Sequence, residues 1–410
     1  MKRAQLESHI LILVTLGLTA FGLVMVYSAT SAPAALGGSD PGFYLKRQGL
    51  YALLGLVLMI GASRADFRAL RYAAPVLVLS SAGLCVAVLA IGQEVNGARR
   101  WLVFGPLTFQ PSEVAKLAIA VWAAAYLARK PAPQTFAELI RPIGLTVGVF
   151  CALILVEPDL GTVIALVVVV GAILVVSGTP LRTLGAGGSV AAALALAAIW
   201  ITPYRRERFF AFLDPWQDAQ GAGFQTVQAM IGIGSGGILG EGLAQGVQKV
   251  NYLPEAHTDM IFAIIGEELG LVGVSLVIAA YVAFAYAGLR VALRCKDPFG
   301  KRLAAGLTAL VSGQALLNLA AVLGVAPLTG ITLPFVSYGG SSLVVSLAAV
   351  GVLLNIAGDG AHAAVAVPDR RRGNGGPRRA VAGGRGSARR ARSGSDVRRV
   401  AGSRRGAARS

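Results

Sequence analysis

The sequence predicts an all-α polytopic membrane protein with ten transmembrane helices, a large extracellular loop and a disordered basic C-terminal tail. Of its 410 residues, 55% are hydrophobic and only 14% are charged, whereas about a quarter of the residues of a soluble domain are charged. The mean hydropathy is +0.67. Apolar segments also recur along the chain up to residue 357, and about 20 apolar residues suffice for a helix to cross a bilayer.

The ten expected spans cover residues 10–29, 48–63, 72–91, 112–128, 142–156, 160–177, 184–203, 269–289, 303–325 and 341–357. Lys2 and Arg3 precede the first segment, and the small residues 28–32 follow its apolar core. Cleaved signal peptides show the same pattern. Because this apolar run is about 20 residues long, which exceeds a typical signal core, we interpret it as a retained first helix.

The Lys and Arg residues of the short loops indicate the orientation, because cytoplasmic loops are enriched in them. With ten spans, nearly all of these residues fall on one side together with both termini, which are therefore predicted to be cytoplasmic. The outer side receives the loops 30–47, 92–111, 157–159, 204–268 and 326–340. The loop 204–268 is too long for a simple connection, and parts of it are apolar enough to lie in the outer leaflet.

The chain is thus expected to divide into a membrane domain, 1–358, and a tail, 359–410. The tail contains 14 Arg and 3 Asp, so it carries +11 of the net charge of +17. It has almost no large apolar residues and is predicted to be disordered. Attraction to the anionic lipids of the inner leaflet is one role for it, and docking to an acidic cytoplasmic partner is the alternative. Because the charge is confined to the tail, no nucleic acid is predicted as a partner.

Metal ligands and disulfides are not indicated by the sequence. The three cysteines are far apart and lack metal-ligand spacing; they are Cys85, Cys151 and Cys295. A glycine pattern over 232–237 matches dinucleotide-binding spacing, but no strand precedes it, so we reject a nucleotide site. Close backbone approach to a ligand or to another helix remains open for these glycines.

Basic residues of the outer loops suit a phosphate-bearing ligand. Arg99, Arg100 and Trp101 lie in the loop 92–111, and Arg205 and Arg206 begin the loop 204–268. Arginine binds phosphate oxygens with two parallel hydrogen bonds. Ordinary anchoring to lipid headgroups is the alternative for both clusters.

Two further outer segments combine helix boundaries with carboxylates. After the loop 92–111, Glu113 and Lys116 lie three residues apart and share one face of the next helix. In the turn Glu157–Asp159, the aspartate is expected to cap the following helix, which leaves a functional role open for Glu157.

The stretch from Leu253 to Asp259 places Glu255, His257 and Asp259 directly before a long apolar helix. Thr258 is the expected N-cap, so Asp259 would lie in the first helical turn. There it serves either as a cap or as a general base toward a sugar hydroxyl, and the residues alone leave both open. One helix over 259–294 would be about 54 Å long, so 259–266 is predicted to be a separate outer helix, with Glu267 and Glu268 at the membrane interface.

The last outer loop, 326–340, contains Pro327, Gly330 and Pro334, followed by Ser337. Proline and glycine break helices and free backbone groups that protein or ligand must satisfy. Non-helical backbone at this depth predicts the wall of a cavity.

Six motifs, in this order, resemble those of the SEDS family (shape, elongation, division and sporulation proteins): NGARRWL, FQPSEVAK, EPDLGT, GSGGILGEGL, LPEAHTDMIFAIIGEELG and PLTGITLPFVSYGGSSL. The resemblance covers about residues 8–358. It implies a ten-helix, multi-pass glycosyltransferase of the bacterial inner membrane that polymerises lipid II into peptidoglycan strands on the outer face. It also implies that Asp259 is the base that deprotonates the acceptor hydroxyl.

Within the family, the stretches 253–273 and 331–340 are more similar to the FtsW branch, which acts at the division septum, than to the RodA branch of elongation. Met260 stands where the family most often has Phe. The family implies a class B penicillin-binding transpeptidase, FtsI-like, as partner, and dependence on a divalent cation, Mg²⁺ or Mn²⁺. Other division proteins are further expected partners, through the tail. The expected substrate-binding residues are Arg100, Trp101, Glu113, Lys116, Arg205, Arg206, Glu255, His257 and Ser337.

Two other classes of function are compatible with the chain. A transporter that flips lipid II should carry polar residues through the bilayer midplane, whereas here they collect at the outer ends of the spans, which favours an enzyme. A scaffold for division proteins, acting through the tail, is compatible with either activity.

Overall fold

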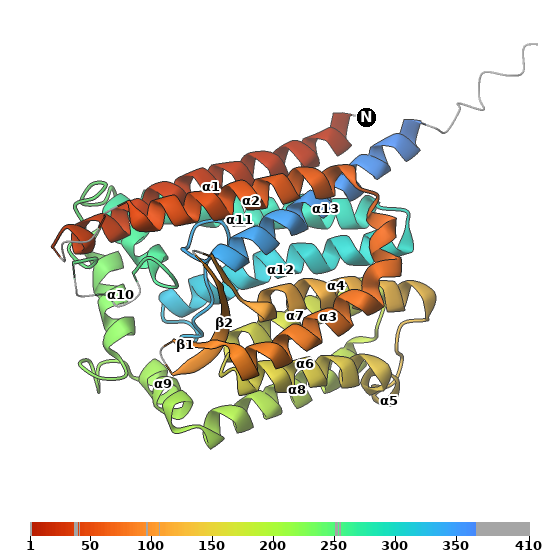
Figure 1. Cartoon of the computed structure of the whole chain (residues 1–410), viewed down its shortest axis with the longest axis horizontal. Coiled ribbons are helices and arrows are strands. Elements are labelled where there is room, and N and C mark those ends of the chain that lie inside the picture. The colour runs from red at the N-terminus through yellow and green to blue at the C-terminus, as the bar shows by residue number, and fades with distance from the viewer. Residues whose placement is uncertain are drawn as a thin grey trace, which may run out of the picture. The chain divides into compact units, whose positions relative to one another are not determined.

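Ten long helical segments in the described part of the chain correspond, in order, to the ten predicted spans (Figure 1). They are α1 (Lys2–Leu36), α2 (Phe43–Arg64), α3 (Leu70–Ile91), α4 (Pro111–Arg129), α5 with α6 (Phe136–Leu139 and Leu145–Val156), α7 (Leu160–Ser177), α8 (Leu181–Ile201), α11 (Ile261–Arg294), α12 (Pro298–Val322) and α13 (Gly340–Val365). Short helical turns over Phe67–Ala69 and Ile140–Gly144 precede α3 and α6. This computed structural model describes residues 2–36, 40, 42–95, 97–105, 107–250, 253 and 256–365.

Nine helices within these described ranges are long and apolar enough to cross a membrane. The remaining predicted span, α4, carries Glu113 and Lys116 among its 19 residues. It packs against α3, α7 and α12, and both charged side chains are buried. Its polar groups therefore face protein, and the fold is the all-α polytopic membrane class that the sequence predicts.

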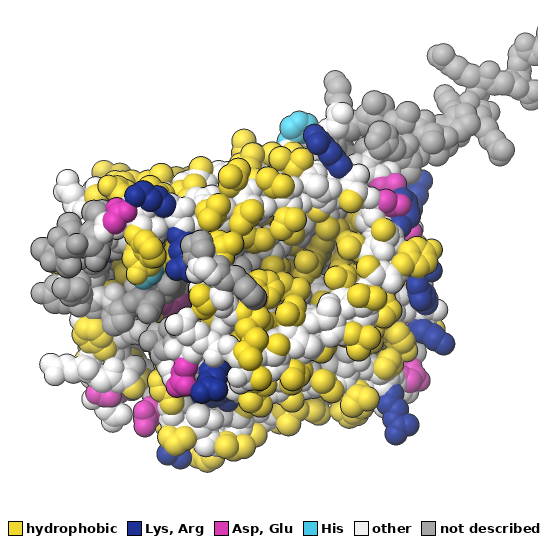
Figure 2. Space-filling model, in the orientation of Figure 1, with side chains coloured by type: hydrophobic (Ala, Val, Ile, Leu, Met, Phe, Trp, Pro, Cys, Tyr) yellow, Lys and Arg dark blue, Asp and Glu magenta, His cyan; other side chains and the backbone are white. Residues whose placement is uncertain are grey.

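The described start of α1 and the end of α13 lie at the same end of the helix bundle (Figure 1). The connections from α2 to α3 and from α4 to α5 lie there too. Figure 2 shows Lys and Arg side chains gathered along this edge, while hydrophobic side chains cover the middle. This distribution is the one expected when a basic end faces the cytoplasm. We call it the basic end and the opposite end the site end.

The helices α2 and α13 pack at close range because glycines line their contact. A Cβ added to Gly55 would lie 2.5 Å from Leu347 Cδ1, and one added to Gly351 would lie 2.3 Å from the carbonyl oxygen of Met59. Small residues permit this approach between membrane helices. The helices α11, α12 and α13 pack against one another, and α12 also packs against α4 and α7. Together these helices bury the polar groups described below.

The long helix α11 is broken at Gly270, which has φ 63° and ψ −161°. Glycine is essentially the only residue that adopts this conformation. The break separates a short helix from the membrane-spanning part of α11, which confirms the prediction of a separate short helix. The short helix covers 261–269, so it begins two residues after the predicted position.

A glycine-rich segment, 236–242, satisfies the backbone groups that this break releases. Four hydrogen bonds join it to α11: Glu241 N to Glu267 O (3.0 Å), Gly242 N to Glu268 O (3.1 Å), Leu271 N to Gly237 O (2.9 Å) and Val272 N to Ile238 O (3.2 Å). A Cβ on Gly240 would lie 2.1 Å from the carbonyl oxygen of Glu268. The glycines thus allow two backbones to pair, which is the close approach that the sequence left open.

The site end contains secondary structure that the sequence did not predict. The strands β1 (Gln93–Val95), β2 (Ala98–Phe104) and β3 (Leu107–Phe109) form an antiparallel sheet in the order β1-β2-β3. The long outer loop folds into α9 (Pro203–Leu213) and α10 (Phe224–Ser235). At the other end, α13 continues to Val365, so the prediction of a disordered tail from residue 359 was wrong for residues 359–365, where the last membrane helix simply continues. The rest of the predicted tail lies outside the described residues.

Candidate active site

Asp259 lies in a turn that comes directly before α11. Met260, and not Thr258, occupies the N-cap position, so Asp259 lies outside the first helical turn and this prediction was wrong. The reason is that other segments hold the turn: Asn318 Nδ2 of α12 donates to the Asp259 carbonyl at 2.7 Å, and Tyr338 N donates to the His257 carbonyl at 2.9 Å. The Thr258 hydroxyl donates to the Asp259 carboxylate at 3.2 Å.

A small, partly open pocket of about 10 Å³, enough for one water molecule or one hydroxyl group, lies beside Asp259. Its walls come from the Asp259 turn, from α12 and from the last outer loop: Asp259, Met260, Asn318, Ala321, Val322, Leu328, Thr329, Gly330 and Ile331. The predicted cavity wall at 326–340 is therefore confirmed for residues 328–331.

The ring of His257 packs against two tyrosines. The centroid distances are 4.6 Å from Tyr44 to His257, 5.4 Å from His257 to Tyr338 and 5.2 Å between the tyrosines. The neighbouring Ser337 is buried; its hydroxyl accepts the Leu333 N–H at 2.8 Å. The Ser337 side chain therefore closes the turn of this loop, and the rings of the cluster present their partly exposed edges at the site end.

Two arginines meet the C-terminal end of α6. Arg100 of β2 donates to the carbonyls of Glu157 and Pro158 at 2.7 and 2.6 Å, and Arg205 of α9 donates to the Leu155 carbonyl at 3.2 Å. Cations suit this end of a helix. Burial and the nearby positive charge of Arg100 lower the pKa of the Arg205 guanidinium. Next to them in sequence, Trp101 is partly exposed and Arg206 is exposed.

Glu157 is fully buried, and its carboxylate lies beside the Cys85 thiol. Burial and the negative charge of Asp159 raise its pKa from 4.5 to about 8, although Cys85 and Arg100 act in the opposite direction. Its carboxyl group is therefore mostly protonated at neutral pH. Asp159 caps α7 as predicted, since its carboxylate accepts the Thr162 N–H at 3.0 Å.

Replacement of Glu157 by Gln is expected to flatten the pH dependence of thermal stability between about pH 4.5 and 8. The folded protein keeps the proton of Glu157 up to about pH 8, whereas the unfolded chain releases it near pH 4.5. Wild-type stability therefore falls as the pH rises through this window, and glutamine removes this contribution. Thermal unfolding of both proteins at pH 5 and pH 8.5 measures the effect; a difference in Tm that is the same at both values would contradict the raised pKa.

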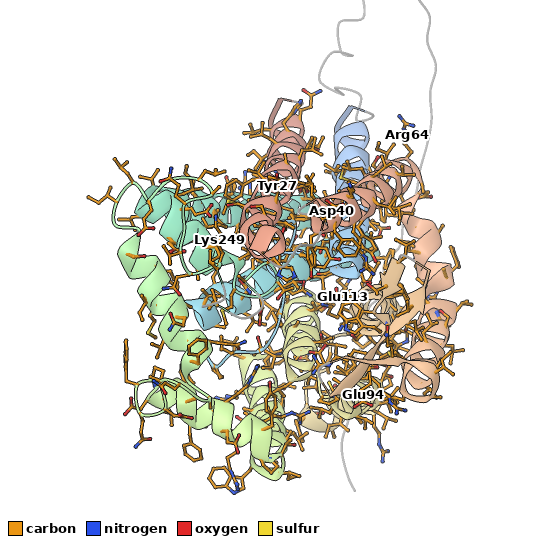
Figure 3. The ribbon with its side chains drawn as sticks, turned by 60° about the vertical axis from the view of Figure 1, so that its left-hand side comes forward. Tyr27, Asp40, Arg64, Glu94, Glu113 and Lys249 are labelled. Atoms are coloured by element: carbon orange, nitrogen blue, oxygen red, sulfur yellow. The ribbon has the colours of Figure 1, made fainter. Side chains whose placement is uncertain are left out.

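Gln110, the residue before α4, connects the turn 157–159 with the start of α13. Gln110 Nε2 donates to the Asp159 carboxylate at 3.2 Å, and Gln110 N donates to the Ser341 hydroxyl at 2.9 Å. One turn along α4, Lys116 Nζ lies 2.8 Å from Glu113 Oε1 in a buried ion pair. Figure 3 shows Glu113 among the helices of the bundle. The predicted pairing of Glu113 with Lys116 is thus confirmed.

Glu267 and Glu268 are buried inside the protein, and their predicted position at the depth of the membrane interface stays a prediction. Glu268 accepts hydrogen bonds from Lys249 Nζ at 2.6 Å and from the Ser28 hydroxyl at 2.8 and 2.7 Å. Glu267 Oε1 accepts the Val247 and Gln248 N–H groups at 2.7 and 3.1 Å. Figure 3 shows Lys249 close to α1, the helix that carries Tyr27. These contacts hold residues 247–249 against residues 267–268, which are the two ends of the segment that contains Asp259.

The structure thus brings the predicted residues together in two groups. Asp259 lines the pocket, and Tyr338, which follows Ser337, donates its N–H to the carbonyl of His257. Arg100 and Arg205 form the arginine cluster at the end of α6. Glu255 lies outside the described residues. Sequence reasoning missed Asn318 and Lys249; the signal for Asn318 was a polar amide inside an apolar span, which is itself an indication of function.

The divalent cation implied by the resemblance stays a prediction. Among the residues that the structure describes, no group of three or more His, Cys, Asp or Glu side chains could hold a metal ion.

A bundle of long apolar helices with a pocket and buried charged groups at one end defines a polytopic membrane protein that acts at a membrane surface. The chain belongs to the cell cycle protein family of FtsW, RodA and SpoVE, whose sequence profile matches residues 8–361.

Curated relatives cover most of the chain. The probable peptidoglycan glycosyltransferase FtsW of Geobacter sulfurreducens is 42% identical over 350 residues, which are 85% of this chain and 94% of that protein. The stage V sporulation protein E of Bacillus subtilis is 37% identical over 351 residues, 85% of this chain and 96% of that one.

Solved structures share the fold. The rod shape determining protein RodA of Thermus thermophilus has a TM-score of 0.63 at 29% identity and covers 85% of this chain and 96% of its own. A chain from a peptidoglycan synthase complex, described as coordinating polymerization and crosslinking, has a TM-score of 0.71 at 32% identity and covers 85% of this chain and 97% of its own.

Proposed function

We propose that this protein is a peptidoglycan glycosyltransferase that polymerises lipid II into glycan strands at the outer face of the bacterial cell membrane during division. The observation that carries the proposal is the pocket beside Asp259, at the end of the bundle opposite the basic end. The name of the relative from Geobacter sulfurreducens, a probable peptidoglycan glycosyltransferase, supports it.

In the proposed reaction, the Asp259 carboxylate removes the proton from an acceptor sugar hydroxyl. The hydroxyl oxygen then attacks the anomeric carbon of the donor lipid II, and the bond from that carbon to the lipid pyrophosphate breaks. Positioned general bases contribute about 10²- to 10⁴-fold to such steps. The fixed backbone of the Asp259 turn supports this role, because a base must be held in place to act on a bound hydroxyl.

The arginine cluster supplies positive charge for the leaving pyrophosphate. Arg100 and Arg205 are held by backbone carbonyls, so their guanidinium groups keep a fixed position without a neutralising carboxylate bound to them. Trp101, Arg206, Glu255 and His257 complete the proposed substrate-binding surface. Glu113, Lys116 and Ser337 are buried, and they support its walls.

The proposal extends to the surroundings of the enzyme. The basic end faces the cytoplasm together with both termini, and the basic tail that follows the membrane domain contacts anionic lipids or other division proteins. An FtsI-like class B penicillin-binding transpeptidase is the proposed partner at the septum, in keeping with the synthase complex that contains a chain of the same fold. The bound divalent cation is part of the same proposal.

Polymerisation of lipid II by the purified full-length chain, with and without the transpeptidase, tests the proposed function. Fluorescent lipid II in liposomes should become long glycan strands that resolve as a ladder on a gel. Translocation of labelled lipid II across the liposome membrane, measured in parallel, separates the two activities. If labelled lipid II is translocated but no polymer forms, the proposed glycosyltransferase activity is overturned, and the protein is instead a transporter of lipid II.

A further inference from the structure

The side-chain amide of Asn318 has hydrogen-bond partners for its nitrogen but, among the described residues, none for its oxygen. Its nitrogen donates to the carbonyl of Asp259 at 2.7 Å and to the carbonyl of Ile331 at 2.8 Å. Because both partners can only accept, the nitrogen of the amide must face them, and the orientation of the side chain is fixed. Asn318 is 2% exposed, yet its Oδ1 has no hydrogen-bond partner among the described residues.

A second open polar atom lines the same pocket. The hydroxyl oxygen of Thr329 is buried and has no partner in the part of the chain that the structure describes. The backbone of Thr329 is held against α7, where a Cβ added to Gly161 would lie 2.7 Å from the Thr329 carbonyl oxygen. The position of the hydroxyl is therefore set by packing, in the same way as that of the Asn318 amide.

Buried polar atoms without partners cost free energy unless a water molecule or a ligand satisfies them. Here two of them, Asn318 Oδ1 and Thr329 Oγ1, belong to residues that line a pocket of about 10 Å³, which Asp259 also lines. The amide oxygen accepts only, so its partner must bring an O–H or N–H group, whereas the threonine hydroxyl donates or accepts. A single sugar hydroxyl, which is no larger than a water molecule, meets both requirements, because it donates to the amide oxygen and accepts from the threonine.

We propose that Asn318 and Thr329 form a hydroxyl-binding subsite that holds the acceptor sugar beside Asp259. This inference rests on the proposed function and assigns two residues to it. Asn318 holds the backbone of the base with its nitrogen and the sugar with its oxygen, so one rigid side chain sets the separation between base and reacting hydroxyl. Asn318 is thus both a binding residue and a positioning residue, and Thr329 is a binding residue.

Replacement of Thr329 by Val tests the subsite, because valine has the same shape and removes only a hydroxyl that bonds to no described protein group. Equilibrium binding of lipid II to the full-length protein in nanodiscs should weaken about three- to tenfold, the effect of one lost neutral hydrogen bond, with unchanged Tm. Thr329→Ser keeps the hydroxyl and should bind as wild type. The control is Thr308→Val on the same helix as Asn318, where the lost hydroxyl bonds only to the Ala304 carbonyl of its own helix.

Polymerisation by the same variants separates binding from positioning. Thr329→Val should raise KM with little change in kcat, whereas Asn318→Ala, which also releases the Asp259 carbonyl, should lower kcat as well. If Thr329→Val binds lipid II as tightly as the wild type and has the same KM, the subsite is overturned. Water would then be the hydrogen-bond partner of Asn318 Oδ1 and Thr329 Oγ1. Binding is measured directly and does not depend on polymerisation. If the wild-type protein makes no polymer but Thr329→Val still binds lipid II more weakly than the wild type, the subsite is supported and only the proposed reaction is overturned.

Discussion

Replacement of Asp259 by Asn is expected to abolish the formation of glycan strands while the protein remains folded. Asparagine has nearly the same shape, but its amide does not take up a proton from a hydroxyl at neutral pH. Loss of a general base lowers a rate by about 10²- to 10⁴-fold. The fold should tolerate the change, because Asn318 holds this residue through its backbone carbonyl, which the substitution keeps.

The measurement is the initial rate of lipid II polymerisation, together with Tm and elution from a gel-filtration column. Asp214→Asn is the matched control, since Asp214 is an exposed carboxylate at the end of α9 in the same outer region. A folded Asp259→Asn variant that polymerises at the wild-type rate would exclude the carboxylate as the base. A variant that fails to fold would assign Asp259 to the structure of the turn.

Replacement of Lys249 by Met is expected to cause the largest loss of stability among the variants described. It leaves the carboxylate of Glu268, which is 0% exposed, without its cation at 2.6 Å. Removal of one partner from a buried ion pair costs about 3–5 kcal/mol. Because the pair joins the two ends of the segment around Asp259, polymerisation should fall together with Tm.

Two further variants sharpen this test. Lys46→Met removes the cation of an exposed ion pair with Asp40, and its effect on Tm should be small, since exposed pairs contribute little. The double variant Lys249→Met with Glu268→Gln removes both charges, so it should regain part of the lost Tm. A wild-type Tm for Lys249→Met alone would show that the pair does not hold the segment.

The helices were predictable from the sequence because a bilayer imposes a length and a composition on each span. Even α4 was recognised, since two charged residues on one helical face do not interrupt its apolar pattern. The boundaries of α11 were less accurate: nothing local to Thr258 indicates that Asn318 and Tyr338 hold the turn from outside. The sheet at the site end was missed because its strands are only 3 to 7 residues long.

The candidate site was predictable only in part. The residues alone left Asp259 as either a cap or a base, and the motifs around it decided for the base. The burial of Glu267 and Glu268 could not be predicted, because their partners cannot be read locally; Ser28 is 240 residues from Glu268 in the chain. Asn318 and Thr329 require knowledge of which backbone groups use each hydrogen-bonding atom, and that depends on the folded arrangement.

The break in α11 has a mechanical consequence. A glycine in the middle of a helix normally acts as a hinge at which two rigid parts swing independently. At Gly270, however, hydrogen bonds from the glycine-rich segment run to both sides of the break, so bending there would require them to rupture. A tilt imposed on the membrane-spanning part of α11 is therefore transmitted, undamped, to the short helix 261–269 and to the turn that carries Asp259.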